Sequence, residues 1–132
     1  MSSTEADQQK DRSHIGRLDI LDQRFPVRRV LELISDKWTP VLLYCLSIGE
    51  VRRFNELQRR IPDISKKMLI QTLRNLERDG FVHRTVYQQV PPKTEYRLTE
   101  DGHKIREPIV QLCTWAQDNE VFVEGVLCRR AP

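Results

Sequence analysis

The 132-residue sequence has no apolar run near the roughly 20 residues that a helix needs to cross a bilayer. Its first residues lack the basic region and apolar stretch of a secretory signal. The three cysteines show no C-x-x-C pairing, which argues against a disulfide framework. The three histidines do not fall at metal-ligand spacings with one another or with the cysteines, which argues against zinc. We therefore expect a cytoplasmic protein without a membrane segment, a metal or a cofactor.

The motifs of common enzyme classes are also missing. The sequence has no Gly-rich phosphate loop, no G-x-S-x-G, no H-E-x-x-H and no dense cluster of titratable residues. We therefore expect no catalytic residues. The length allows one domain with a single modest core, and 39% hydrophobic and 31% charged residues are ordinary values for a globular protein.

Positive charge is concentrated in one part of the chain. The net charge is only +3, but the segment from Arg52 to Arg97 has 11 Lys and Arg against 5 Asp and Glu. The remainder has 11 against 14 and is therefore net acidic. A basic excess confined to one segment is what a polyanion-binding surface requires.

The centre of the basic segment, from Ser65 to Gly80, has helix signals at both ends. Ser65 can cap the first turn, and Gly80 can adopt the left-handed conformation that ends a helix. Helical spacing predicts a buried stripe of Leu69, Leu73 and Leu76. A second face combines cations and an amide: Lys67, Gln71, Arg74 and Arg78. This face suits the major groove of DNA, where Arg and Lys pair with guanine and Gln pairs with adenine; charges that only face water are the alternative.

The N-terminal part of the chain predicts a tail followed by helices. Residues 1–13 are polar and are expected to form a disordered tail, and residues 15–25 give a weak helix signal. Pro26 can open the next helix, whose apolar stripe is Val27, Val30, Leu31 and Ile34. Asp36 can act as an N-cap for a further helix. Because residues 41–48 are almost entirely apolar, we expect this helix, apolar nearly all round, to be the central one.

The chain before Ser65 completes a familiar DNA-binding pattern. Residues 52–54 predict a very short strand, and residues 55–60 predict a short helix with Leu57 directed inward. Pro62 and Asp63 then turn the chain into the basic helix. A short helix, a tight turn and a second helix with an exposed polar face form a helix-turn-helix.

After Gly80 the pattern changes from helical to extended. Residues 81–87 are rich in β-branched and aromatic side chains, and residues 94–98 alternate, so we predict a two-stranded hairpin with a polar tip at the intervening prolines. Thr99 can cap a final helix, which Pro108 should kink or limit. The apolar stripe of that helix is Ile105, Ile109, Leu112, Trp115 and Ala116. This order of elements is that of a winged helix.

Several short motifs then point to one family. In chain order they are Asp36–Thr39, Arg53–Leu57, Ile61–Ser65, Leu73–Glu77, Asp79–Val82, Val90–Pro92, Glu95–Thr99 and Gly102. Over about residues 25–120 the sequence closely resembles the HxlR-type helix-turn-helix transcriptional regulators, which are small dimeric relatives of the MarR group. The resemblance implies an α+β, mainly helical fold: a winged helix-turn-helix with an N-terminal arm and a C-terminal dimerisation helix.

We accordingly expect one domain over residues 14–128, with the helix-turn-helix at 54–80, the wing at 81–98 and the dimerisation helix at 100–120 with an extension. The resemblance implies a sequence-specific regulator that binds a roughly palindromic operator as a homodimer. Its recognition helix would lie in the major groove and the hairpin would reach the minor groove. Many members have a redox-sensing cysteine before a Pro-Val pair, where this sequence has Phe25.

The basic helix of the helix-turn-helix and the family resemblance together indicate the candidate DNA contacts. They are Ser65, Lys66, Lys67, Gln71, Arg74, Arg52, Arg53 and Lys93. We expect Gln71 and Arg74 to read base edges, and the lysines of the helix to contact phosphate. Arg53 could equally form a local salt bridge. The alternative function is a winged helix without sequence-specific DNA binding, whose basic face docks on an acidic protein.

The remaining candidates are aromatic residues and thiols. Four aromatic residues lie on apolar faces and are expected in the core: Trp38, Tyr87, Tyr96 and Trp115. Cys45 lies in the most apolar helix, where it should be an inert small hydrophobe. Oxidative sensing through Cys113 or Cys128 is the minor hypothesis, because no nearby base is evident to activate a thiol. A small-molecule or redox effector is the remaining expected partner.

Overall fold

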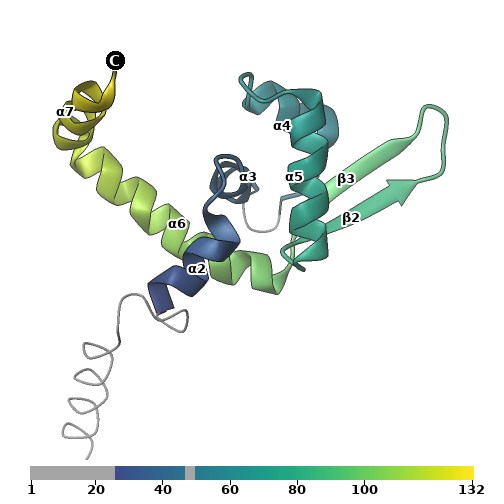
Figure 1. Cartoon of the computed structure of the whole chain (residues 1–132). Coiled ribbons are helices and arrows are strands. Elements are labelled where there is room, and N and C mark those ends of the chain that lie inside the picture. Colours follow the sequence, from purple (N-terminus) through teal and green to yellow (C-terminus); the bar gives the residue numbers. More distant parts are fainter. Residues whose placement is uncertain (1–25, 47–49) are drawn as a thin grey trace, which may run out of the picture. The chain divides into compact units, whose positions relative to one another are not determined.

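The computed structural model describes residues 26–46 and 50–132 (Figure 1). The chain divides into two compact units, residues 1–35 and 36–132, and each is described by itself. The tail expected at residues 1–13 and the weak helix expected at 15–25 lie outside the described residues.

The described part of the first unit is one helix, α2 (Pro26–Ile34), as the apolar stripe predicted. Pro26 is tolerated at its start because the first N–H groups of a helix have no partner within the helix. Val27, Val30 and Leu31 of the predicted stripe are exposed. The helix therefore presents an apolar surface.

The second unit begins with the short helix α3 (Thr39–Cys45). The N-cap position of α3 is Trp38 rather than the predicted Asp36. Asp36 still holds the turn that starts the helix, because its Oδ1 accepts hydrogen bonds from the backbone N–H of Trp38 at 3.0 Å and of Thr39 at 2.9 Å. Leu42 and Leu43 are fully buried. On the last turn, the guanidinium of Arg106 donates to the carbonyls of Leu43 and Tyr44 at 3.1 and 3.2 Å.

Although its sequence is apolar nearly all round, α3 is not buried on every side. The helix packs against α6 (Glu100–Asp118), whereas Val41 and Tyr44 are exposed. The Arg106 guanidinium of α6 lies over the Tyr44 ring, 5.7 Å from its centre. An apolar sequence can show that a helix is buried, but it cannot show how many neighbours cover it. Residues 47–49, at the end of the predicted run, lie outside the described residues.

The predicted helix-turn-helix is confirmed. It consists of α4 (Phe54–Arg60) and α5 (Lys66–Arg78). Ser65 Oγ accepts a hydrogen bond from the N–H of Met68 at 3.1 Å, and Gly80 has a φ of 81°, so both helix-end signals operate. The two helices and the turn share a buried apolar set: Leu57, Ile61, Ile64, Leu69, Leu73 and Leu76.

The wing is an antiparallel hairpin of β2 (Val82–Tyr87) and β3 (Lys93–Leu98). The very short strand β1 (Arg52–Arg53) is also present, but it pairs with β3 and completes a three-stranded sheet in the order β1-β3-β2. The predicted two-stranded hairpin and the predicted short strand are therefore both present, but the pairing of β1 with the hairpin was not predicted. Two residues contain too little pattern to indicate that they will bond to the free edge of β3, 40 residues along the chain.

Two helices end the chain, α6 and α7 (Glu120–Arg130), separated at Asn119. Thr99 Oγ1 caps α6 by accepting a hydrogen bond from the N–H of Gly102 at 3.1 Å, as predicted. The alternative that Pro108 limits this helix is wrong, because α6 continues through it for ten further residues. Proline removes only one hydrogen bond, and a helix of this length tolerates that loss when its ends are capped and packed.

The apolar stripe of α6 is only partly buried. Ile109 lies in the core, whereas Leu112 and Trp115 are 64% and 49% exposed. Among the four aromatic residues expected in the core, Tyr96 is buried, Trp38 is half-buried, and Tyr87 and Trp115 are exposed. The core prediction is therefore wrong for Tyr87 and Trp115 in the isolated chain. None of the described helices has the length and apolar character to cross a membrane.

Candidate nucleic-acid interface

The outer face of α5 combines positive charge with hydrogen-bonding capacity. Lys66, Lys67, Gln71 and Arg74 are all exposed, and Lys67, Gln71 and Arg74 share the face away from the buried leucines. The leucines fix the rotation of the helix, and this rotation directs the polar side chains outward. All four candidate contacts of the helix are therefore accessible to a partner.

Three cations of this face have no local counter-charge. Within the described part of the chain, Lys66, Lys67 and Arg74 form no ion pair. The acids near the end of α5 are already paired: Glu77 lies 3.3 Å from the Arg84 guanidinium, and Asp79 lies 3.1 Å from that of Arg78. The unpaired cations can bind phosphate oxygens without first breaking a salt bridge.

Gln71 is already oriented by its own helix. Its Nε2 donates to Asn75 Oδ1 at 3.1 Å, one turn further along. The other amide atom of Gln71 remains accessible, so the side chain keeps the acceptor capacity that adenine recognition requires. Asn75 was not among the candidates from the sequence; its one-turn spacing from Gln71 is the signal that could have identified it.

Arg52 and Arg53 have different environments despite their adjacency. Arg52 is held by Glu50 at 2.6 Å and Glu56 at 3.5 Å, and its side chain is only 25% exposed. Arg53 is exposed and forms no ion pair with any residue that the structure describes, although its backbone N–H donates to Glu56 at 3.3 Å. Of the two, Arg53 is the side chain that is available to a polyanion.

Lys93 belongs to a small cluster on the outer face of the wing. Its Nζ lies 2.8 Å from Glu95 and 5.0 Å from the centre of the Tyr87 ring, and Tyr87 donates to Glu95 at 3.2 Å. The hydrogen bond from Lys93 is the largest influence on Glu95 and lowers the pKa of that carboxyl. Lys93 is thus oriented by its neighbours, and a phosphate would compete with Glu95 for it.

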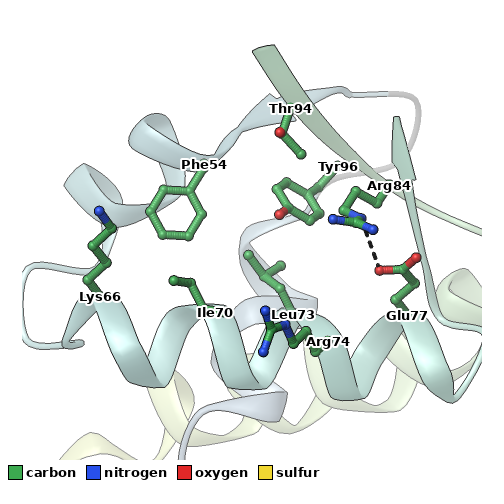
Figure 2. A pocket seen from close by; sticks show the side chains of 9 residues that line it. All are labelled: Phe54, Lys66, Ile70, Leu73, Arg74, Glu77, Arg84, Thr94 and Tyr96. Atoms are coloured by element: carbon green, nitrogen blue, oxygen red, sulfur yellow. Dashed lines mark ion pairs between the residues drawn. The ribbon is translucent and has the colours of Figure 1, made fainter. Parts of the chain in front are cut away.

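A groove separates α5 from the inner face of the wing (Figure 2). Phe54, Tyr96 and Arg84 line it together with residues of α5. Arg84 lies on the same face of β2 as Val82 and Val86, and register pairs it with Tyr96. These lining residues were not candidates from the sequence. Strand alternation could have placed Arg84 on the same face as Tyr96, but nothing local indicated that this face lies against α5.

The three cysteines lie in three different environments. Cys45 is half-buried at the end of α3, and this burial is the main reason why the pKa of its thiol is raised. Cys113 is half-buried on α6, and Cys128 is exposed on the last turns of α7. Across residues 26–46 and 50–132, no group of three or more His, Cys, Asp or Glu side chains could hold a metal ion.

Comparison with known proteins agrees with this geometry. The family model described as HxlR-like helix-turn-helix matches residues 33–122. The HTH-type transcriptional regulator YybR of Bacillus subtilis is 44% identical over 100 residues, which cover 76% of this chain and 79% of YybR.

Solved structures give the same result. The redox regulator HypR in its reduced form has a TM-score of 0.70 and 44% identity, covering 76% of this chain and 98% of HypR. A MarR-family transcriptional regulator from Porphyromonas gingivalis has a TM-score of 0.72 and 34% identity, covering 77% of this chain and 99% of that protein. The relatives are regulators of transcription rather than enzymes. This chain is therefore a DNA-binding transcriptional regulator of the winged helix-turn-helix type and belongs to the HxlR-like family.

Proposed function

We propose that the protein recognises a specific, roughly palindromic operator as a homodimer, with α5 of each subunit in the major groove. The observation that supports this proposal most directly is the outer face of α5, where three unpaired cations and one amide are exposed together. A helix with this face matches the width and the hydrogen-bonding pattern of the major groove.

The exposed residues divide into two roles. Gln71 and Arg74 read base edges, because amide and guanidinium groups can form paired hydrogen bonds with adenine and guanine. Lys66 and Lys67, near the N-terminus of α5, bind phosphate. The backbone N–H groups of the first turn, which follows the N-cap Ser65, lie at the same end and favour an anion there. Gln71 and Arg74 thereby determine sequence specificity, and the two lysines contribute affinity for DNA of any sequence.

The wing and the start of α4 supply further backbone contacts. Arg53, Asn55 and Lys93 line one shallow groove beside the prolines of the wing tip. Arg53 and Lys93 bind phosphates on either side of the minor groove that the wing enters. Arg52 contributes less directly, because Glu50 and Glu56 hold its guanidinium.

The homodimer is supported by the exposed apolar surface of the last two helices. Leu112 and Trp115 of α6 and Phe122 of α7 are 64%, 49% and 62% exposed, and the rings of Trp115 and Phe122 meet edge to face with centres 6.3 Å apart. A patch of large apolar side chains on a small protein is typical of a subunit interface. Two-fold pairing through this patch would present two copies of α5 to a palindrome.

An effector is the remaining partner in this proposal. HypR, one of the similar structures, is a redox regulator. The position before Pro26, where many family members have a redox-sensing cysteine, is Phe25 in this chain. An oxidant would therefore act through Cys128, which is exposed, or Cys113, which is half-buried. As a regulator of transcription, the protein acts in the cytoplasm, where bacterial and archaeal DNA is found.

Selection of bound sequences from random DNA, followed by affinity measurements, tests the proposal. The selected sites should contain two inverted half-sites. Arg74→Ala should weaken binding to the selected site by about 1–3 kcal/mol and relax preference at one position, with a smaller effect on unrelated DNA. Arg129→Ala, an exposed arginine near the end of α7, is the matched control and should leave both affinities unchanged. Equal loss on all sequences for Arg74→Ala would contradict base reading.

A further inference from the structure

One large apolar side chain is exposed among the polar residues of α5. Within residues 54–78, all of which the structure describes, Met68 is the only large hydrophobic residue that is exposed, with 43% of its surface accessible. Leu69 and Leu73 of the same helix are almost completely buried, so the core of the helix-turn-helix closes without Met68. Apolar surface left in water gains free energy when a partner covers it. Met68 is therefore available to an apolar group of whatever binds α5.

Met68 occupies the part of α5 that meets the bases in a helix-turn-helix. It is the third residue of the helix, and the N-terminal residues of a recognition helix contact base edges. Its backbone is fixed at both ends, because its N–H donates to Ser65 Oγ at 3.1 Å and its carbonyl accepts a hydrogen bond from Thr72 Oγ1 at 2.8 Å. The side chain thus extends from a fixed point, while its flexible thioether can fit an uneven surface.

Gln71 follows Met68 at the spacing of neighbours on a helix surface. The hydrogen bond from Gln71 Nε2 to Asn75 Oδ1 orients the amide along the same helix. The function proposed above assigns Gln71 to adenine, and the base that pairs with adenine is thymine. The 5-methyl group of thymine is the apolar group that the major-groove edges of the bases present. An apolar side chain beside Gln71 therefore has a matching target in the groove.

The chemistry of Met68 excludes the other contacts that DNA offers. A thioether has no hydrogen-bond donor and is only a weak acceptor, so it can neither bind phosphate nor pair with the polar atoms of a base. We propose that Met68 reads the methyl group of one thymine in each half-site, beside the base pair that Gln71 contacts. The inference rests on the function proposed above, because α5 must lie in the major groove. It adds an apolar contribution to specificity that the cations and the amide of α5 cannot supply.

Uracil tests the proposal, because it differs from thymine only by this methyl group. Each thymine of the selected operator is replaced by uracil in both half-sites, one position at a time, and the affinity is measured by titration with labelled DNA. At one position the parent protein should bind at least about tenfold more weakly, since burial of one methyl group contributes about fourfold in each half-site.

Met68→Ala should bind the thymine and uracil operators at that position with affinities within about twofold of each other, because alanine is too short to reach the methyl group. Met68→Leu, which keeps an apolar side chain of similar volume, should retain most of the uracil effect. Alanine at this exposed helix position should leave the fold intact, which urea denaturation checks.

Lys67→Ala is the matched control, because it removes a proposed phosphate contact from the neighbouring residue. It should weaken binding to both operators equally and keep the full uracil effect. The absence of a uracil effect at every position in the parent, or an equal effect in the parent and Met68→Ala, would overturn the inference and leave operator recognition standing. Lack of preference for the unmodified operator over unrelated DNA would instead overturn the proposed function, and the inference with it.

Discussion

Gly102 shows how a single residue determines where the last long helix joins the wing. Its N–H donates to the capping Thr99, and its backbone approaches the Phe81 carbonyl so closely that a Cβ atom there would overlap the carbonyl oxygen and lie 3.0 Å from Leu98. We predict that Gly102→Ala lowers the free energy of unfolding by about 1–3 kcal/mol, measured by urea denaturation, because backbone must move to make room.

Substitution of Gly125 provides a control, because its expected effect on the free energy of unfolding has the opposite sign. It lies within α7, and no atom lies within 4 Å of the position where its Cβ would be. Gly125→Ala should therefore raise the stability by about 0.5–1 kcal/mol through helix propensity alone. If both substitutions changed the stability in the same direction, the close contact at Gly102 would be contradicted.

Asp36 makes the stability of α3 depend on pH. Burial opposes its charged form, but hydrogen bonds from the hydroxyl and N–H of Thr39 and the N–H of Trp38 outweigh this effect, so the pKa of Asp36 lies below its usual value of 3.8. A lowered pKa adds stability that is complete above the unfolded-state value and disappears as the pH falls through the folded-state value.

We therefore predict that Asp36→Asn is less stable than the parent at neutral pH, and that this difference decreases below pH 3.8. Urea denaturation of both proteins across this range measures the difference directly, and acids elsewhere in the chain cancel between them. A stability difference that stays constant as the pH falls through and below 3.8 would show that the charge of Asp36 has no role in the turn that starts α3.

At the scale of elements, the start of α5 combines a structural role with a proposed DNA contact. Ser65 caps the helix beside Lys66 and Lys67. Ser65→Asp should keep the stability of the helix, because aspartate is an equally good N-cap and is favoured by the helix dipole. It should nevertheless weaken operator binding by about tenfold or more, because it places a negative charge against phosphate.

Ser65→Asn separates these two effects, because asparagine caps the helix without adding charge. This variant should keep both stability and most of the operator affinity, measured by urea denaturation and by titration with labelled operator. Equal operator affinities for the aspartate and asparagine variants would remove this end of α5 from the interface.

The elements that the sequence predicted correctly are those whose signals are local. The leucine spacing of α5, the cap at Ser65, the glycine at position 80 and the alternation along β3 each arise within one element, and each is confirmed. The order of these elements along the chain then indicated a winged helix, and the family resemblance agreed with it.

The features that the sequence did not predict depend on distant partners. The exposure of Tyr44, the pairing of β1 with β3 and the groove beside α5 result from contacts between segments far apart in the chain. Periodicity gives the face that a residue occupies, but it does not give the neighbour that the face meets. For the same reason the candidate site was found on α5 and missed at Arg84 and Tyr96.

At the scale of the whole molecule, the exposed apolar patch of α6 and α7 determines the proposed assembly. We predict that the protein is a dimer in sedimentation experiments, and that Leu112→Glu produces a folded monomer, because the introduced charges would be buried in the interface. Leu112 is largely exposed in one chain, so the substitution leaves the fold of that chain intact. Val90→Glu, on the exposed wing tip, is the control and should remain dimeric. A dimer that is insensitive to Leu112→Glu would place the interface elsewhere.

The dependence of operator binding on salt tests most directly whether the outer face of α5 contacts DNA. Each phosphate contact contributes about 0.9 to the slope of log affinity against log salt concentration. Lys67→Ala should therefore make the slope less steep by about 1.8 in a two-fold complex, while Arg129→Ala should leave the slope unchanged. An unchanged slope for Lys67→Ala, or an equal change for both variants, would contradict the placement of α5 in the major groove.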